Sequence, residues 1–155
     1  MTEAWRLCRR PYADLLGEGA RRWGGRWNSP GKPVVYLSEH PALAVLEVLV
    51  HLDVPLDLLP ADYVLVRVQL PDEAPSVVAD DLSDTKAAGD AWLSAGDSAT
   101  LRVPSLLVPF AHNVLLNLQH AHAPAATISS TTAFRFDARL WGGQSDAVQT
   151  SGTNA

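Results

Sequence analysis

The sequence predicts an α+β fold, in a single compact domain with a mixed β-sheet core. Residues 34–38 and 63–70 have the apolar patterns of strands, and residues 41–52 between them have the pattern of a helix. The remaining helix and strand patterns do not alternate regularly, which disfavours a doubly wound parallel sheet. A chain of 155 residues is long enough to bury about two thirds of the surface of its unfolded form.

The N-terminal part is predicted to contain one strand and a long loop. Residues 4–8 have the composition of a short strand. After Pro11, glycines at positions 17, 19, 24, 25 and 31 mark turns. We therefore expect an irregular segment up to residue 33, and such a loop offers a surface for a ligand.

The middle of the chain carries the clearest elements. Pro41 suits the first turn of a helix over residues 41–52, with Ser38 or His40 as its candidate cap. Residues 63–70 are predicted as a half-buried strand because apolar and polar side chains alternate. The apolar face consists of Val64, Val66, Val68 and Leu70, and the polar face of Arg67 and Gln69.

The next segment is acidic and rich in turns. One short helix is predicted there, over residues 85–93. Residues 99–108 resume an extended apolar pattern, in which Pro104 indicates a sheet edge or a bend.

The C-terminal part is less regular. Residues 113–120 fit either a strand or a helix, and residues 133–136 are predicted as the last strand. Residues 142–155 are polar, so we expect a domain over residues 1–141 followed by a disordered tail.

Composition excludes several classes of function. The net charge is -5 and the arginines are scattered, so no basic stripe for nucleic acid is predicted. Cys8 is the only cysteine, which excludes an internal disulfide and fits a reducing compartment, with the cytoplasm expected. No apolar run reaches the roughly 18 residues of a membrane span, and no export signal is predicted.

Glu47 is the strongest candidate for a functional residue. It lies in the apolar helix pattern, where Leu43, Leu46 and Val50 are predicted to share its buried stripe. A buried acid must be paired, protonated or used in chemistry. The structural alternative is a buried ion pair with an arginine such as Arg26, which is costly to desolvate, so we favour a function.

A glycine-rich loop precedes this helix and contains Gly24-Gly25-Arg26-Trp27. The glycines permit close approach of a ligand, and the guanidinium of Arg26 suits a phosphate. Trp27 could pack against a flat ring. Alternatively, the motif is a tight turn with a surface arginine and a core tryptophan. Tyr36 is likewise either a core aromatic residue or a residue that stacks on a ligand ring.

Arg6 and Ser105 are weaker candidates. Arg6 either reaches a cleft as an anion ligand or lies on an exposed strand face. Ser105 either orients a ligand or bonds to the backbone. It is a poor candidate for a nucleophile, because no His and Asp lie at a recognisable spacing from it in the sequence.

A metal site is not predicted. His112, His120 and His122 follow no metal-ligand pattern, and the sequence around them lacks carboxylates.

Several blocks of the chain resemble the RES-domain toxins, and the resemblance extends to about Leu140. The matching blocks are Gly24-Gly25-Arg26-Trp27-Asn28, Val35-Tyr36-Leu37-Ser38, residues 42–51, Val103-Pro104-Ser105 and residues 113–117. The chain departs from the family pattern at residues 109–113. It also reads Asn117-Leu118-Gln119-His120 where relatives usually have Asn-Pro-x-His.

The resemblance implies a fold like that of diphtheria-toxin-like ADP-ribosyltransferases and NAD as the substrate, with no metal. It implies that Arg26, Glu47 and Ser105 are the residues that name the family, with Tyr36 as a further catalytic residue. Arg6, Arg26, Trp27, Tyr36, Ser105 and Asn113 are the expected NAD-binding residues.

In that chemistry, Glu47 would stabilise the oxocarbenium-like ribose as the nicotinamide bond breaks. Arg26, with Arg6, would hold the pyrophosphate, Tyr36 would stack on nicotinamide, and Ser105 would orient the ligand. Water, phosphate or a protein would then attack the ribose.

The expected function is that of a toxin that depletes NAD, with an Xre-type helix-turn-helix antitoxin covering the active site. One alternative is ADP-ribosylation of a protein such as phosphoribosyl pyrophosphate synthetase. Another is a non-catalytic NAD-binding or interaction module, in which Glu47 only pairs with Arg26. A homodimer and a larger toxin–antitoxin assembly both remain open.

Overall fold

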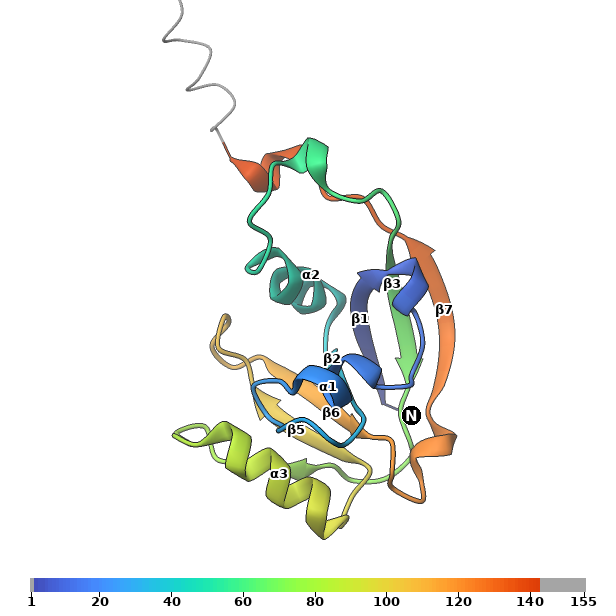
Figure 1. Cartoon of the computed structure of the whole chain (residues 1–155), viewed down its shortest axis with the longest axis vertical. Coiled ribbons are helices and arrows are strands. Elements are labelled where there is room, and N and C mark those ends of the chain that lie inside the picture. The colour runs from blue at the N-terminus through green and yellow to red at the C-terminus, as the bar shows by residue number, and fades with distance from the viewer. Residues whose placement is uncertain (1, 143–155) are drawn as a thin grey trace, which may run out of the picture.

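The strand patterns of the sequence assemble into one sheet in a computed structural model that describes residues 2–142 (Figure 1). Within that range, seven strands form a mixed sheet in the order β4-β5-β6-β2-β1-β3-β7. The strands are β1 (Glu3–Arg9), β2 (Val34–Ser38), β3 (Tyr63–Gln69), β4 (Ser76–Val77), β5 (Thr100–Pro104), β6 (His112–Asn117) and β7 (Thr127–Ala133). The helices are α1 (Glu18–Trp23), α2 (Pro41–Leu49) and α3 (Thr85–Ala95).

Short 3-10 helices connect these elements: η1 (Arg10–Tyr12), η2 (Leu56–Leu58), η3 (Ala123–Ala125) and η4 (Ala138–Trp141). All strand pairs are antiparallel except β4 with β5. The predicted α+β class with a mixed sheet in one domain is therefore confirmed. The predicted tail falls, apart from Gly142, outside the described residues.

β1 and β3 form the longest regular ladder of the sheet. They pair along seven positions, from Glu3↔Gln69 to Arg9↔Tyr63. The valines at alternate positions of β3 are fully buried and Arg67 is exposed, as the alternation predicts.

β1 and β2 diverge, because they pair only at Trp5↔Ser38. β2 instead runs alongside β6 over five positions, from Val34↔Asn117 to Ser38↔Asn113. The sheet is therefore continuous between β1 and β2 at this one pair, and the two strands are not paired along the rest of their length.

α2 begins where the sequence predicts and ends earlier, at Leu49. His40 is its cap, since its Nδ1 accepts the amide of Ala42 at 3.1 Å. Leu43 is buried, but Leu46 and Val50 are 40% and 54% exposed, so the predicted buried stripe is wrong. The reason is that the helix fully buries only Leu43 and Ala44, and in the next turn Glu47 and Val48 line a cavity while Leu46 faces outward.

The N-terminal segment is less irregular than predicted, because it contains η1 and α1. α1 is short and buries no side chain, which explains why it left no apolar pattern. Gly17 precedes it with a φ of 65°, and a Cβ there would lie 2.6 Å from the amide nitrogen of Val34.

Elements of the C-terminal half differ in how well they were predicted. α3 begins where predicted and runs two residues further, to Ala95, and it is capped by Asp84, whose Oδ1 accepts the amide of Ala87. Pro104 is the last residue of β5, and the ambiguous segment after it forms β6.

The predicted last strand at residues 133–136 is wrong, because β7 lies earlier. β7 is exposed along its whole length and has no apolar alternation. Phe134 and Phe136 follow it and pack edge to face, and Phe136 also contacts Tyr63 and Trp141. These aromatics form a local cluster and not a strand.

Two hydrophobic clusters lie on opposite faces of β2. The first contains Ala4, Val35, Leu37, Val64, Val66, Val68, Leu70, Ala99, Val114, Leu116 and Ala123. The second contains Trp27, Val34, Trp92, Leu93, Leu101, Val103 and Leu115, and it includes the side chains of α3 that face the sheet. In residues 2–142, none of the helices is long and apolar enough to span a bilayer.

Candidate active site

A cavity of about 250 Å³ lies where β1 and β2 separate, beside α2. Its lining brings together four of the residues predicted for the site: Arg6, Tyr36, Glu47 and Asn113. The other lining residues are Trp5, Leu7, Leu37, Ser38, Ala44 and Val48. The cavity therefore combines aromatic and aliphatic walls with one cation and one carboxylate.

Neutral side chains hold the carboxylate of Glu47. Its Oε1 accepts hydrogen bonds from Nδ2 of Asn113 at 2.8 Å and from Oγ of Ser105 at 3.1 Å. Asn113 is oriented in turn by Ser38, whose Oγ donates to Oδ1 of Asn113 at 2.8 Å. Among the described residues no ion pair joins Glu47 to Arg26, and the side chains that bond to the carboxylate are uncharged.

The contacts of Ser105 show what its hydroxyl can do. The amides of Leu107 and Val108 donate to its Oγ at 3.0 and 3.2 Å, so that its proton points to Glu47. The amide of Ser105 also donates to the carbonyl of Ala111 at 2.9 Å. Ser105 therefore joins the loop at residues 105–111 to Glu47, an arrangement that suits positioning and not nucleophilic attack.

Tyr36 joins the sheet to the glycine-rich loop. Its hydroxyl donates to Oδ1 of Asn28 at 2.5 Å and accepts the amide of Trp27 at 3.1 Å. Burial raises the pKa of Tyr36 to about 12, so this hydroxyl is neutral at physiological pH. A Cβ on Gly25 would lie 2.5 Å from the Tyr36 oxygen, which explains the glycine at this position.

Arg26 and Trp27 do not line the cavity. Arg26 is exposed in the turn between Gly25 and Asn28, with its guanidinium carbon 5.6 Å from the centre of the Trp27 ring. Trp27 is 3% exposed and belongs to the second hydrophobic cluster. This placement matches the structural alternative for the motif, a tight turn with a surface arginine and a core tryptophan.

Arg6 is the arginine that lines the cavity. Its Nη1 donates to the carbonyl of Asp14 at 2.9 Å, and no other hydrogen bond ties this side chain to the rest of residues 2–142. The remaining guanidinium donors can serve an anion, since arginine carries five N–H groups.

Sequence reasoning missed Ser38 and Trp5 as site residues. Ser38 lies two positions after Tyr36 on β2, and alternate residues of a strand share a face, so this spacing was the available signal. Trp5 lies beside Arg6 in β1, and its ring is 6.4 Å from that of His40.

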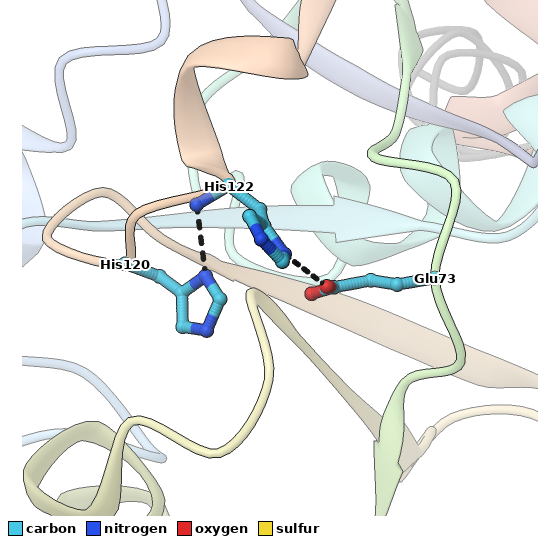
Figure 2. Close-up of side chains that lie close together, drawn as sticks. All are labelled: Glu73, His120 and His122. Carbon is cyan, nitrogen blue, oxygen red and sulfur yellow. Dashed lines mark hydrogen bonds and ion pairs between the residues drawn. The ribbon is translucent and has the colours of Figure 1, made fainter.

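The histidines lie apart from this cavity. His120 and His122 group with Glu73, as Figure 2 shows, and Oε2 of Glu73 lies 2.5 Å from Nδ1 of His122. The sequence-based statement that no carboxylate accompanies these histidines is therefore wrong. Glu73 is distant in the sequence and comes close only in the fold.

Comparison with known proteins agrees with this architecture. Residues 3–137 match the family described as the RES domain. The chain belongs to the RES domain family.

Named relatives of this RES-domain chain are toxins. It is 36% identical over 145 residues to "Toxin Res" of Pseudomonas putida strain KT2440, with 88% of this chain and 98% of the relative covered. It is 34% identical over 157 aligned positions to the "Prs ADP-ribosylating toxin" of Sphingobium sp. strain YBL2, with 90% and 96% covered.

A solved structure shares the RES-domain fold of this chain. A chain of the crystal structure of the M. tuberculosis MbcT–MbcA toxin–antitoxin complex superposes with a TM-score of 0.72 at 22% identity. The superposition covers 86% of this chain and 84% of that chain. This likeness confirms the predicted architecture.

Proposed function

We propose that this RES-domain protein is the toxin of a toxin–antitoxin pair and cleaves NAD at the bond between nicotinamide and ribose. The observation that carries the proposal is the carboxylate of Glu47. Ser105 and Asn113 hold it in a cavity that also contains Arg6 and Tyr36. The relatives named as toxins support the same proposal.

Glu47 stabilises the reacting ribose in this mechanism. When the bond from C1 of the ribose to the nicotinamide nitrogen breaks, its electron pair leaves with nicotinamide and positive charge develops on the ribose. A fixed carboxylate stabilises that charge in the transition state. Both described hydrogen bonds of Glu47 reach Oε1, and Oε2 remains for a ribose hydroxyl or the incoming acceptor.

Arg6 and Tyr36 position the substrate. The guanidinium of Arg6 binds the pyrophosphate, and the Tyr36 ring forms a wall against which nicotinamide stacks. The resemblance also assigns Arg26 to the pyrophosphate. The two arginines are distinguished by the KM for NAD of the variants Arg6→Ala and Arg26→Ala. Loss of the arginine that binds the pyrophosphate should raise this KM more.

The decisive experiment measures nicotinamide release from NAD by chromatography, with and without inorganic phosphate. Glu47→Gln keeps the size of the side chain and removes its charge, so we expect a loss of about 100-fold or more in rate with the fold preserved. Glu18→Gln is the matched control, because Glu18 is exposed on α1 and bonds to Arg21. Full activity in Glu47→Gln would contradict the mechanism, and a dependence on phosphate would identify the acceptor.

A second candidate is transfer of ADP-ribose to a protein. The relative named as a Prs ADP-ribosylating toxin favours it, and the bond that breaks is the same. The test is to incubate labelled NAD with the protein and phosphoribosyl pyrophosphate synthetase. Two results together would select transfer over NAD depletion. The synthetase becomes labelled only when Glu47 is present, and no nicotinamide is released when the synthetase is left out.

A third candidate is the non-catalytic module, for which a pair between Glu47 and Arg26 was the expected structural sign. The described residues contain no such pair, and Glu47 bonds instead to Ser105 and Asn113. NAD binding without nicotinamide release or transfer under all these conditions would nevertheless select this candidate.

We propose that the partner is an Xre-type helix-turn-helix antitoxin that covers the cavity. Exposed apolar side chains lie on both sides of Glu47: Leu46 on α2 and Val50 at its C-terminal end, and Leu106, Leu107 and Phe110 on the loop that Ser105 joins to Glu47. A protein surface docked on α2 and this loop would close the cavity to NAD. The neighbour solved as a toxin–antitoxin complex supports a partner of this kind.

The partner is tested with a small helix-turn-helix protein encoded beside this gene. Its addition should stop nicotinamide release by the wild-type chain. The double variant Leu106→Ser and Phe110→Ser should remain active and require more of the partner for inhibition. Equal inhibition of both proteins would place the partner elsewhere.

A further inference from the structure

A group of metal-binding side chains lies outside the site that contains Glu47. Glu73 follows β3, and His120 and His122 lie in the turn after β6 (Figure 2). None of the three lines the cavity of Glu47. The proposed function leaves this group without a role.

The three side chains are already close enough to share one ion. One ligand atom from each lies within 4.8 Å of the other two, and Nδ1 of His122 is 2.5 Å from Oε2 of Glu73. Two donors on a tetrahedral zinc ion are roughly 3.3 Å apart, because Zn–N and Zn–O bonds are about 2.0–2.2 Å long. Small rotations of the three side chains would therefore bring them to bonding distance.

One backbone contact fixes the orientation of Glu73, and another shows which ring nitrogen of His120 accepts a hydrogen bond. The amide of Ala99 donates to Oε1 of Glu73 at 2.6 Å, so Oε2 is the oxygen that faces the histidines. Nδ1 of His120 accepts the amide of His122 at 3.0 Å, so this nitrogen carries a lone pair and no proton. A metal ion needs that form of imidazole and would take the lone pair in place of the amide.

The turn that carries the histidines is itself well ordered by hydrogen bonds. The amide of His120 donates to the carbonyl of Asn117 at 3.1 Å, and the amide of Ala123 to the carbonyl of His120 at 3.0 Å. The amide of Gln119 donates to Oδ1 of Asn117. The ligands therefore lie on a fixed backbone, which reduces the entropy lost on binding.

We propose that Glu73, His120 and His122 bind a divalent transition metal ion, with zinc as the best match. Two imidazole nitrogens and one carboxylate oxygen suit zinc and its analogue cobalt, whereas magnesium and calcium prefer oxygen ligands alone. His122 is 65% exposed on its side chain, so the ion enters from solvent and water completes its coordination. The bound ion would join the segment after β3 to the turn after β6, next to Ala99, the residue before β5.

The test is a titration of the purified full chain, stripped with a chelator, with Co²⁺ and with Zn²⁺. Visible absorption of four-coordinate Co²⁺ reports the geometry, and calorimetry with Zn²⁺ reports stoichiometry and affinity. We expect one ion per chain, displacement of Co²⁺ by Zn²⁺, and a higher Tm with Zn²⁺.

Variants separate the site from adventitious binding. His122→Ala and Glu73→Gln should each weaken Zn²⁺ binding at least about 10-fold. The amide oxygen introduced by Glu73→Gln would still accept the amide of Ala99, so that variant is expected to fold. His51→Ala is the control, because His51 is exposed after α2 and outside the group.

Two results would overturn the proposal. The first is no saturable binding up to roughly 0.1 mM Zn²⁺, which would leave only a histidine–glutamate hydrogen bond. The second is an unchanged affinity for Zn²⁺ in both His122→Ala and Glu73→Gln, when far-ultraviolet circular dichroism shows that both variants are folded. Neither readout uses NAD, so the outcome is independent of the proposed function.

Discussion

No salt bridge to Glu47 occurs in the described part of the chain, although Arg6 lines the same cavity. Ser105 and Asn113 supply hydrogen bonds but no positive charge. Such donors fix the position of a carboxylate while they leave its field directed at the cavity. The isolated acid in the apolar helix pattern lies in the cavity, although the predicted burial of Leu46 and Val50 was wrong.

Tyr36 should titrate unusually late. Its folded pKa of about 12 exceeds the ordinary value of 10.0 because partial burial removes water that would stabilise the tyrosinate. A phenol with a raised folded pKa contributes stability that is fully present below pH 10 and is lost as the pH rises toward 12. We expect near-ultraviolet absorbance of tyrosinate to show a late step that Tyr36→Phe removes, and an unchanged titration curve in that variant would contradict the assignment.

Phe110 should contribute nothing to the stability of the isolated chain. Its φ is 68°, a conformation unfavourable for a residue with a Cβ, and its side chain is 98% exposed. We expect Phe110→Gly to leave the free energy of unfolding unchanged or to raise it by up to about 1 kcal/mol in urea denaturation. Leu106→Gly is the control and should destabilise by about 0.5–1 kcal/mol, because Leu106 has no positive φ to relieve.

At the scale of the elements, contact between α3 and the glycine-rich loop positions the wall of the cavity. Ser29 donates through both its amide and its hydroxyl to the carboxylate of Asp90 on α3, at 2.8 and 2.6 Å. Ser29 hydrogen bonds lower the pKa of Asp90, so acid should weaken this contact. The loop in turn holds the hydroxyl of Tyr36, which links α3 indirectly to the cavity.

Gly89 should be indispensable to that contact. A Cβ at this position of α3 would lie 1.6 Å from the carbonyl oxygen of Trp27, so Gly89→Ala must displace the loop. We expect a loss of about 2 kcal/mol or more in the free energy of unfolding, measured with urea. Gly19→Ala in α1 is the matched control: a Cβ there meets no atom within 4 Å, so a neutral or stabilising change of up to about 1 kcal/mol is expected. Similar effects of both changes would refute the steric argument.

Elements with a periodic apolar pattern were predictable, and those without one were not. β2, β3 and α2 bury alternate or clustered side chains, and these patterns are visible in the sequence. α1 buries no side chain, and β7 is exposed throughout and is held by backbone hydrogen bonds to β3. Neither element therefore leaves an apolar pattern in the sequence.

The candidate site was predictable in its residue types and only partly in its geometry. The alternation of residues in β1 could not show whether the side chain of Arg6 faced the cavity. The motif Gly24-Gly25-Arg26-Trp27 could not show whether Trp27 belonged to the hydrophobic core. Glu73 could not be assigned to the histidines, because 49 residues separate it from His122. Such contacts depend on the packing of distant segments.

At the scale of the whole molecule, NAD should stabilise the folded chain if the cavity binds it. Glu47→Gln is the suitable protein for this measurement, because it should bind NAD without consuming it. At 100 times the dissociation constant, a ligand adds about 2.7 kcal/mol to the free energy of unfolding. We expect NAD to raise the Tm of Glu47→Gln and to raise it less when Arg6→Ala is added. Equal shifts in both proteins would exclude Arg6 from binding.

The two edges of the sheet limit how copies of the chain can associate. β4, at one edge, is two residues long. β7, at the other, consists largely of threonine and serine, and its register with β3 is interrupted between Arg67 and Val68. A short edge and a polar, irregular edge are poor templates for strand addition. Any assembly that includes this chain is therefore expected to form through side chains on its helices and loops, and a fibre that grows by continuing the sheet from molecule to molecule is disfavoured.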